Sequence, residues 1–149
     1  MRDQFTNDLK TAMKAGEKRR VDTIRMVMAA LKERDIEARG AGKSVSDEDI
    51  LALLQKLVKS RAESADIYEK AGRPELAAQE REEAAIITAY LPQPMDEAQQ
   101  REAIQAAIRE VGATSVKDMG KVVGALKARF AGRMDFGKAS AAIKAALAG

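Results

Sequence analysis

Apolar side chains recur at spacings of three and four residues along most of this chain, and that period is typical of amphipathic α-helices. Val21, Ile24 and Leu31 lie on one such stripe, and similar stripes follow in later segments. Glycines, prolines and helix-capping residues separate the stripes from one another. The pattern predicts seven helices: the first ends at Gly16, and the others extend over about 20–39, 46–70, 74–90, 96–111, 115–132 and 135–147.

The segment YLPQPM ends the fourth predicted helix, because Pro92 and Pro94 cannot continue a helix and disfavour an immediate restart. We therefore predict an all-α protein with an N-terminal four-helix domain at 1–91 and a C-terminal three-helix module at 95–149. The composition agrees with this fold class. Alanine, the best helix former, is the commonest residue, and aromatic residues make up only 3% of the chain.

Cysteine and histidine are missing, and their absence excludes several kinds of chemistry. Without cysteine the chain can form no disulfide, thiolate nucleophile or thiolate metal site, and without histidine it lacks the commonest general base and metal ligand. The longest apolar run, Met26–Leu31, is far shorter than the roughly 20 residues that span a bilayer. The start MRDQFTNDLK is unlike a signal peptide. We expect a soluble cytoplasmic protein with no catalytic residues, cofactor, metal or membrane partner.

Charge is distributed in three blocks of alternating sign. Residues 1–44 hold 11 basic and 7 acidic side chains, for a net charge of +4. Residues 45–100 have a net charge of −6, and residues 101–149 have one of +5. Blocks of opposite sign indicate that different surfaces meet different partners, and the basic C-terminal block is the candidate nucleic-acid surface.

The sixth predicted helix combines an apolar stripe with a basic face. Val116, Met119, Val123, Leu126 and Phe130 follow a spacing of 3, 4, 3 and 4, which predicts that they form the core side. A second face, turned about 120° away, carries what we call the glycine–lysine face: Lys117, Gly120, Lys121, Gly124 and Lys127.

Glycine inside a helix costs about 1 kcal/mol relative to alanine, so two of them on one face suggest that something approaches the backbone closely. The partner could be another helix or a nucleic-acid backbone. The alternative without a partner is an ordinary helix face exposed to solvent. Arg129, Arg133 and Lys138 extend the positive charge. Because the module has only Phe130 and Phe136 as aromatics, phosphate contacts to a folded RNA fit better than base stacking.

Two other clusters of charge have structural interpretations. Arg61 falls within the apolar face of the third predicted helix, and Glu80 and Glu83 fall within that of the fourth. Since charges are rarely buried unless paired, we predict an ion pair of Arg61 with Glu80 or Glu83 that fixes the helix register, rather than an acid–base or metal site. The basic residues near the first helix connection are interpreted as a solvated turn: Lys14, Lys18, Arg19 and Arg20.

Three segments carry a resemblance to the GatB/YqeY family: LKTAMKAGEKRRVDTIRMVMAALK, KLVKSRAESADIYEKAGRPELAAQEREEAAIITAYLP and DMGKVVGALKARFAGRMDFGKAS. Together they indicate that nearly the whole chain resembles a stand-alone member of that family. The resemblance implies an N-terminal helical domain and a C-terminal module similar to the tail of the B subunit of the glutamyl/aspartyl-tRNA amidotransferase. The same module is appended to some glutaminyl-tRNA synthetases. The family pattern often reads GK-apolar-MG, and here Val123 replaces the methionine.

In those settings the module is thought to help hold tRNA, so the resemblance implies that role for Lys117, Gly120, Lys121, Gly124, Lys127 and Arg133. The first hypothesis is therefore a non-catalytic tRNA-binding or tRNA-associated accessory protein. The alternative is a protein-interaction adapter for a tRNA-dependent amidotransferase or an aminoacyl-tRNA synthetase. A third hypothesis, a carbon–nitrogen ligase that uses glutamine as amido donor, follows from the family label only. Neither a nucleophile stretch nor a phosphate-cradling glycine loop occurs in the sequence.

Overall fold

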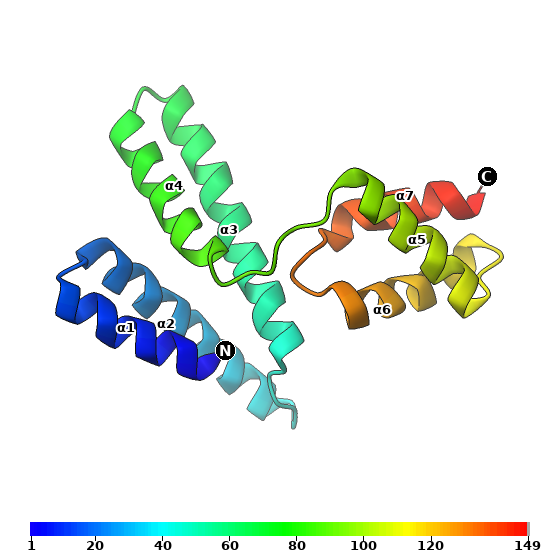
Figure 1. Ribbon diagram of the computed structural model, residues 1–149, viewed down its shortest axis with the longest axis horizontal. Coiled ribbons are helices and arrows are strands. Elements are labelled where there is room, and N and C mark those ends of the chain that lie inside the picture. The colour runs from blue at the N-terminus through cyan, green and yellow to red at the C-terminus, as the bar shows by residue number, and fades with distance from the viewer. Residues whose placement is uncertain (149) are drawn as a thin grey trace. The chain divides into compact units, whose positions relative to one another are not determined.

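A computed structural model of the chain describes residues 1–148 (Figure 1). These residues form helices and connecting turns and no strand, which confirms the all-α prediction. None of the described helices is long and apolar enough to cross a membrane. The elements are α1 (Arg2–Ala15), α2 (Lys18–Gly40), α3 (Asp47–Lys70), α4 (Pro74–Thr88), α5 (Glu97–Val111), the 3-10 turn η1 (Val116–Asp118), α6 (Met119–Phe130) and α7 (Phe136–Ala148).

Local hydrogen bonds explain where the helices begin. The Ser46 hydroxyl accepts a hydrogen bond from the Asp49 N–H at 3.1 Å, and the Asp49 carboxylate accepts one from the Ser46 N–H at 3.0 Å. Asp96 caps α5 in the same reciprocal way. The predicted caps of these two helices are therefore confirmed. α2 begins two residues earlier than predicted and α4 ends two residues earlier, which is the usual uncertainty of helix ends.

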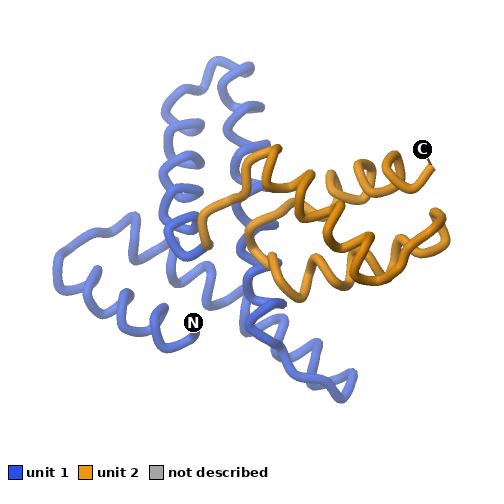
Figure 2. Tube along the Cα trace, turned by 45° about the vertical axis from the view of Figure 1, so that its right-hand side comes forward, with its two compact units in different colours: residues 1–91 blue, residues 92–149 orange. Residues whose placement is uncertain are grey.

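Contacts within the chain divide it into two compact units, unit 1 (Met1–Leu91) and unit 2 (Pro92–Gly149) (Figure 2). In unit 1, α1 packs along α2 and α3 packs along α4. Its core is built from residues of all four helices: Phe5, Ile24, Val27, Leu31, Ile50, Leu53, Leu54 and Ile87. In unit 2, α6 contacts both α5 and α7. The core there is separate: Met95, Ala103, Ile104, Ala107, Val122, Leu126, Met134, Ala139 and Ile143.

The predicted core stripe of the sixth helix is partly wrong. Val122, which the prediction left out, is completely buried, whereas Val123 is only half-buried and Val116 is 38% exposed. The exposure of Val116 follows from η1, because a 3-10 turn advances about 120° per residue instead of 100° and so turns the side chains before Met119 to other directions. Val122 lies in regular α-helix and belongs to the unit 2 core. The Asp118 carboxylate closes this turn by accepting hydrogen bonds from the N–H groups of Thr114 and Ser115. These bonds hold the pKa of Asp118 below its usual value.

Candidate nucleic-acid interface

The glycine–lysine face lies on the exposed side of η1 and α6. Gly120, Lys121, Gly124 and Lys127 are exposed on α6, and Lys117 is exposed on η1. The core residues of α6 lie on the side of the helix that faces α5 and α7. The structure thus leaves all five predicted residues accessible in unit 2, four of them on one helix.

The space around the two glycines is open. A Cβ atom added at Gly120 or Gly124 would meet no other part of the chain within 4 Å, and neither residue has a positive φ. Neither the packing of the described chain nor a left-handed conformation therefore requires glycine at these positions. A close approach that uses this bare backbone must come from outside unit 2.

The lysines of this face keep most of their charge available. Lys117, Lys121 and Lys127 take part in none of the ion pairs between described residues. The Lys127 ammonium lies 5.9 Å from the centre of the Phe136 ring, a cation–π contact that leaves the charge in place. Lys121 is close enough to Asp118 to contribute to the lowered pKa of that carboxyl group. The face is therefore positive, with Asp118 at one edge.

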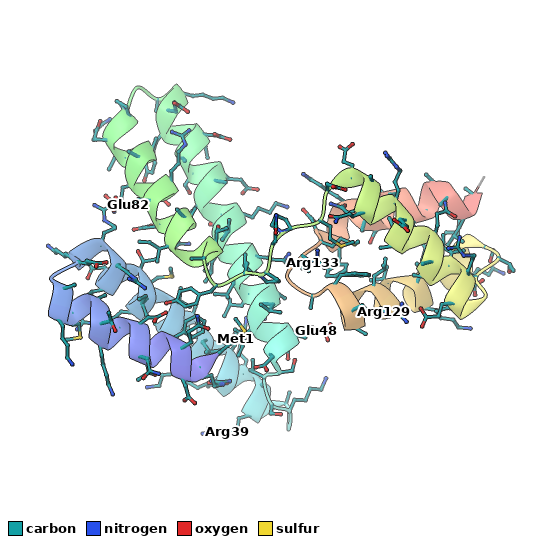
Figure 3. The ribbon with its side chains drawn as sticks, in the orientation of Figure 1. Met1, Arg39, Glu48, Glu82, Arg129 and Arg133 are labelled. Atoms are coloured by element: carbon teal, nitrogen blue, oxygen red, sulfur yellow. The ribbon has the colours of Figure 1, made fainter. Side chains whose placement is uncertain are left out.

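The remaining predicted RNA-binding residues have different surroundings. Arg129 pairs with Glu110 of α5 at 2.7 Å, so part of its charge is neutralised (Figure 3). Arg133 is half-buried, and its Nε donates to the Gln93 carbonyl at 2.9 Å. Lys138 is exposed in the first turn of α7. Of these three side chains, only that of Lys138 forms no ion pair or hydrogen bond with the described residues.

Arg133 also holds the start of unit 2 in place. Its carbonyl accepts a hydrogen bond from the Met95 N–H at 3.1 Å, while its side chain binds Gln93 two residues earlier. Met95 is thereby held in the unit 2 core, where it is 8% exposed. Arg133 thus connects the α6–α7 turn to the segment that follows the predicted proline boundary.

The structure brings Arg61 together with Glu83, and the ion pairs of the described residues do not include Glu80. The Arg61 Nε lies 3.5 Å from Glu83 Oε2, and the two side chains are 16% and 19% exposed. Arg61 also donates to the Leu57 carbonyl at 3.2 Å. An Nε–O distance of 3.5 Å is long for a hydrogen bond, so the attraction is mainly electrostatic. No group of three or more acidic residues in the described chain is arranged to hold a metal ion.

We expect Arg61→Ala to lower the free energy of unfolding by about 2 kcal/mol, because Glu83 would keep a largely buried carboxylate without its partner. Urea denaturation followed by circular dichroism measures this change. The matched control is Arg81→Ala, which removes an exposed arginine paired with Glu69. It should change the stability by less than about 1 kcal/mol. Equal losses in the two variants would show that the Arg61 pair has no special structural role.

Sequence reasoning missed a long-range contact between Tyr90 and Asp8. The Tyr90 hydroxyl donates a hydrogen bond to the Asp8 carboxylate at 2.5 Å, and its ring meets Phe5 edge to face at 4.8 Å. Burial and the bond to Asp8 raise the pKa of Tyr90 to about 12, although the charge of Arg20 opposes the shift. Because 82 residues separate the two partners, no local pattern could have indicated this bond.

Tyr90→Phe is expected to destabilise the chain by about 1 kcal/mol at pH 8, through loss of the bond to Asp8. A tyrosine whose pKa is raised on folding stabilises the fold fully below its unfolded pKa, near 10, and loses this effect as pH rises through about 12. The difference between wild type and variant should therefore shrink between these values. Urea denaturation over that range tests it, with Tyr68→Phe as the control. A difference independent of pH would contradict the assignment.

The chain is similar to known proteins, and this similarity shows its family. The chain matches a family described as "Yqey-like protein" over residues 2–147. It is 36% identical over 84 residues to "Altered inheritance of mitochondria protein 41, mitochondrial" of Eremothecium gossypii, an alignment that covers 56% of this chain and 45% of the relative. The protein of the same name from Lachancea thermotolerans is 35% identical over 86 residues, covering 58% and 45%. The chain thus aligns with less than half the length of either relative. Because the family match extends over almost the whole chain, the protein belongs to the Yqey-like family.

Proposed function

We propose that this chain is a non-catalytic tRNA-binding accessory protein whose C-terminal unit contacts the RNA backbone through the glycine–lysine face. The observation that carries the proposal is the open space around Gly120 and Gly124 beside lysines that form no ion pair among the described residues. A phosphate can approach bare helix backbone closely, and the lysine ammonium groups supply the charge that attracts it. The resemblance of this segment to the tail of the amidotransferase B subunit favours tRNA over other polyanions.

Lys138 is part of the same proposed surface, since it is exposed and unpaired on the first turn of α7. Arg129 and Arg133 contribute less, because Glu110 and the Gln93 carbonyl already engage their side chains. We further propose that units 1 and 2 are separate domains, and that unit 2 carries the RNA-binding function.

Titration of fluorescent tRNA with the full chain tests the proposal. The logarithm of the binding constant should fall linearly with the logarithm of the salt concentration, with a slope of about −2 to −3 if three to four phosphates are contacted. A polymer that carries no charge serves as the control, because it offers no phosphates to bind. If tRNA does not bind at low salt, or if its binding does not depend on the salt concentration, the proposed contact with the RNA backbone is wrong.

A second function is favoured by the same open face. A partner helix with small residues could pack against Gly120 and Gly124 as well as a nucleic acid could, and the acidic block at 45–100 suits a basic partner. In this case the chain would be an adapter for an amidotransferase or a synthetase. Affinity purification with and without ribonuclease separates the two functions. Retention of such a subunit after nuclease treatment favours the adapter, and loss of all partners favours the RNA.

A further inference from the structure

Met13 differs from the other methionines of the chain in its surroundings. The chain has seven methionines. Six of them are buried in one of the two cores or are half-buried against one: Met1, Met26, Met28, Met95, Met119 and Met134. Met13, in the last turn of α1, is 52% exposed and belongs to neither described core. Its side chain is therefore the methionine side chain most accessible to a reagent in solution.

The guanidinium group of Arg25 lies beside the Met13 sulfur. The distance from Arg25 Nη2 to Met13 Sδ is 3.9 Å, and the nitrogen donates to the sulfur. A thioether sulfur is only a weak acceptor. Arg25 is exposed on α2 and forms none of the ion pairs between described residues. It therefore holds a charged donor next to Met13 that a stronger acceptor at the same place could use.

Oxidation of the thioether supplies such an acceptor. The sulfur attacks one oxygen of a peroxide, a sulfur–oxygen bond forms and the oxygen–oxygen bond breaks. With hydrogen peroxide the second oxygen leaves as water, so the sulfur loses two electrons and the peroxide gains them. The product is a polar sulfoxide. A hydrogen bond to its oxygen from a charged guanidinium is charge-assisted and stronger than a bond between neutral groups.

The other methionine–arginine pair of unit 1 does not share these properties. Met26 Sδ accepts from Arg61 Nη2 at 3.3 Å, and both side chains are half-buried. Met26 also packs against the unit 1 core, so a polar oxygen there would disturb apolar packing. At Met13 the new oxygen would meet solvent and Arg25 instead. Among the described methionines, Met13 alone combines exposure with a charged donor beside its sulfur.

We propose that Met13 is a reversible oxidation site, at which a peroxide forms the sulfoxide and Arg25 then donates a hydrogen bond to the new oxygen. This bond joins the end of α1 to α2, two helices that pack along each other (Figure 1). Oxidation therefore strengthens the contact between them instead of weakening it. Methionine sulfoxide reductases return the sulfoxide to the thioether. The site lies in unit 1 and does not depend on the RNA contact proposed for unit 2.

Brief treatment of the full chain with dilute hydrogen peroxide, followed by peptide mass spectrometry, tests which methionine reacts. Because oxidation follows exposure, Met13 should be oxidised at least about tenfold faster than Met95 and Met134, and faster than Met26 and Met28. The two methionine sulfoxide reductases together should restore the original mass. Oxidation of Met26 or Met28 as fast as that of Met13 would overturn the proposal.

The role of Arg25 is tested by the thermal unfolding of unit 1 before and after this treatment. Tyrosine fluorescence reports on unit 1 selectively, because both tyrosines of the chain lie there and tryptophan is absent. In the wild type, oxidation should raise the midpoint by about 2–4 °C, since it adds one charge-assisted hydrogen bond. In Arg25→Ala the midpoint should stay the same or fall. Arg34→Ala, which removes another exposed arginine of α2, is the matched control and should respond as the wild type does.

Met13→Leu separates the effect of this methionine from that of the other six. The same peroxide treatment should leave the midpoint of this variant unchanged, because leucine cannot be converted to a sulfoxide. A midpoint that rises equally in Met13→Leu and in the wild type would assign the effect to another methionine. An equal rise in Arg25→Ala, or a fall in the wild type, would likewise contradict the proposed bond.

Discussion

Reversing Lys117, Lys121 and Lys127 to glutamate is expected to weaken tRNA binding by the full chain on the order of a hundredfold or more at low salt. Each reversal removes an attraction to phosphate and adds a repulsion. All three side chains are exposed and outside the unit 2 core, so the fold should be retained. Fluorescence anisotropy measures the affinity, and circular dichroism verifies the helical content.

A matched control separates this surface from the effect of net charge. Lys56, Lys59 and Lys70 are exposed on α3, and reversing them changes the formal charge of the chain equally, from +3 to −3. This control should bind tRNA with nearly the affinity of the wild type apart from a general charge effect. Equal weakening in the two triple variants would show that the glycine–lysine face is not the RNA contact.

Substitution of a glycine shows whether a partner touches the helix backbone or is attracted by the lysines alone. Because a Cβ atom at Gly124 would meet nothing, Gly124→Ala should stabilise α6 by up to about 1 kcal/mol. If a phosphate or a helix approaches the backbone there, the same methyl group should weaken that partner's binding. If the variant is more stable and binds tRNA as tightly as the wild type does, the lysines make the contact and the helix backbone at Gly124 does not.

Leu126→Ala is expected to have the largest effect on stability, about 2–5 kcal/mol, and to act on unit 2 only. Leu126 is 1% exposed, and the core it belongs to includes no residue of unit 1. A module of fewer than 60 residues has little stability to lose, so the variant should be largely unfolded between residues 92 and 148.

Amide hydrogen exchange reports this loss unit by unit. Residues 1–91 should keep their protection in Leu126→Ala, because their core is built without unit 2. Val116→Ala, at a position that is 38% exposed, serves as the control and should leave both units protected. Loss of protection throughout the chain would contradict the proposal that the two units are separate domains.

Local interactions made most of the fold predictable. Ser46 and Asp96 bond to residues three positions later, so their helix starts can be recognised in the sequence. The exposure of Val116 could not be recognised there, since the 3-10 geometry of η1 depends on how Asp118 closes the turn. Glu80 and Glu83 share a helical face, and only the packing of α3 on α4 selects Glu83 as the partner of Arg61.

The candidate site, too, was only partly predictable from local sequence patterns. The positive face of α6 follows from sequence spacing, but the sequence could not tell whether another helix of unit 2 covers the glycines. The structure answers this with open space at Gly120 and Gly124. In unit 1, Arg19 of α2 lies 3.6 Å from Glu82 of α4, and this pair arises only once the two helices are packed.

The bonds of Arg133 to Gln93 and Met95 have a practical consequence for fusing the C-terminal unit to other proteins. A graft that starts at Asp96, the cap of α5, would discard the buried side chain of Met95 and leave two groups of Arg133 without their hydrogen bonds. A graft that starts at Pro92 keeps all three. The transferable piece therefore begins five residues before α5, and the proline segment belongs to the folded unit rather than to the linker.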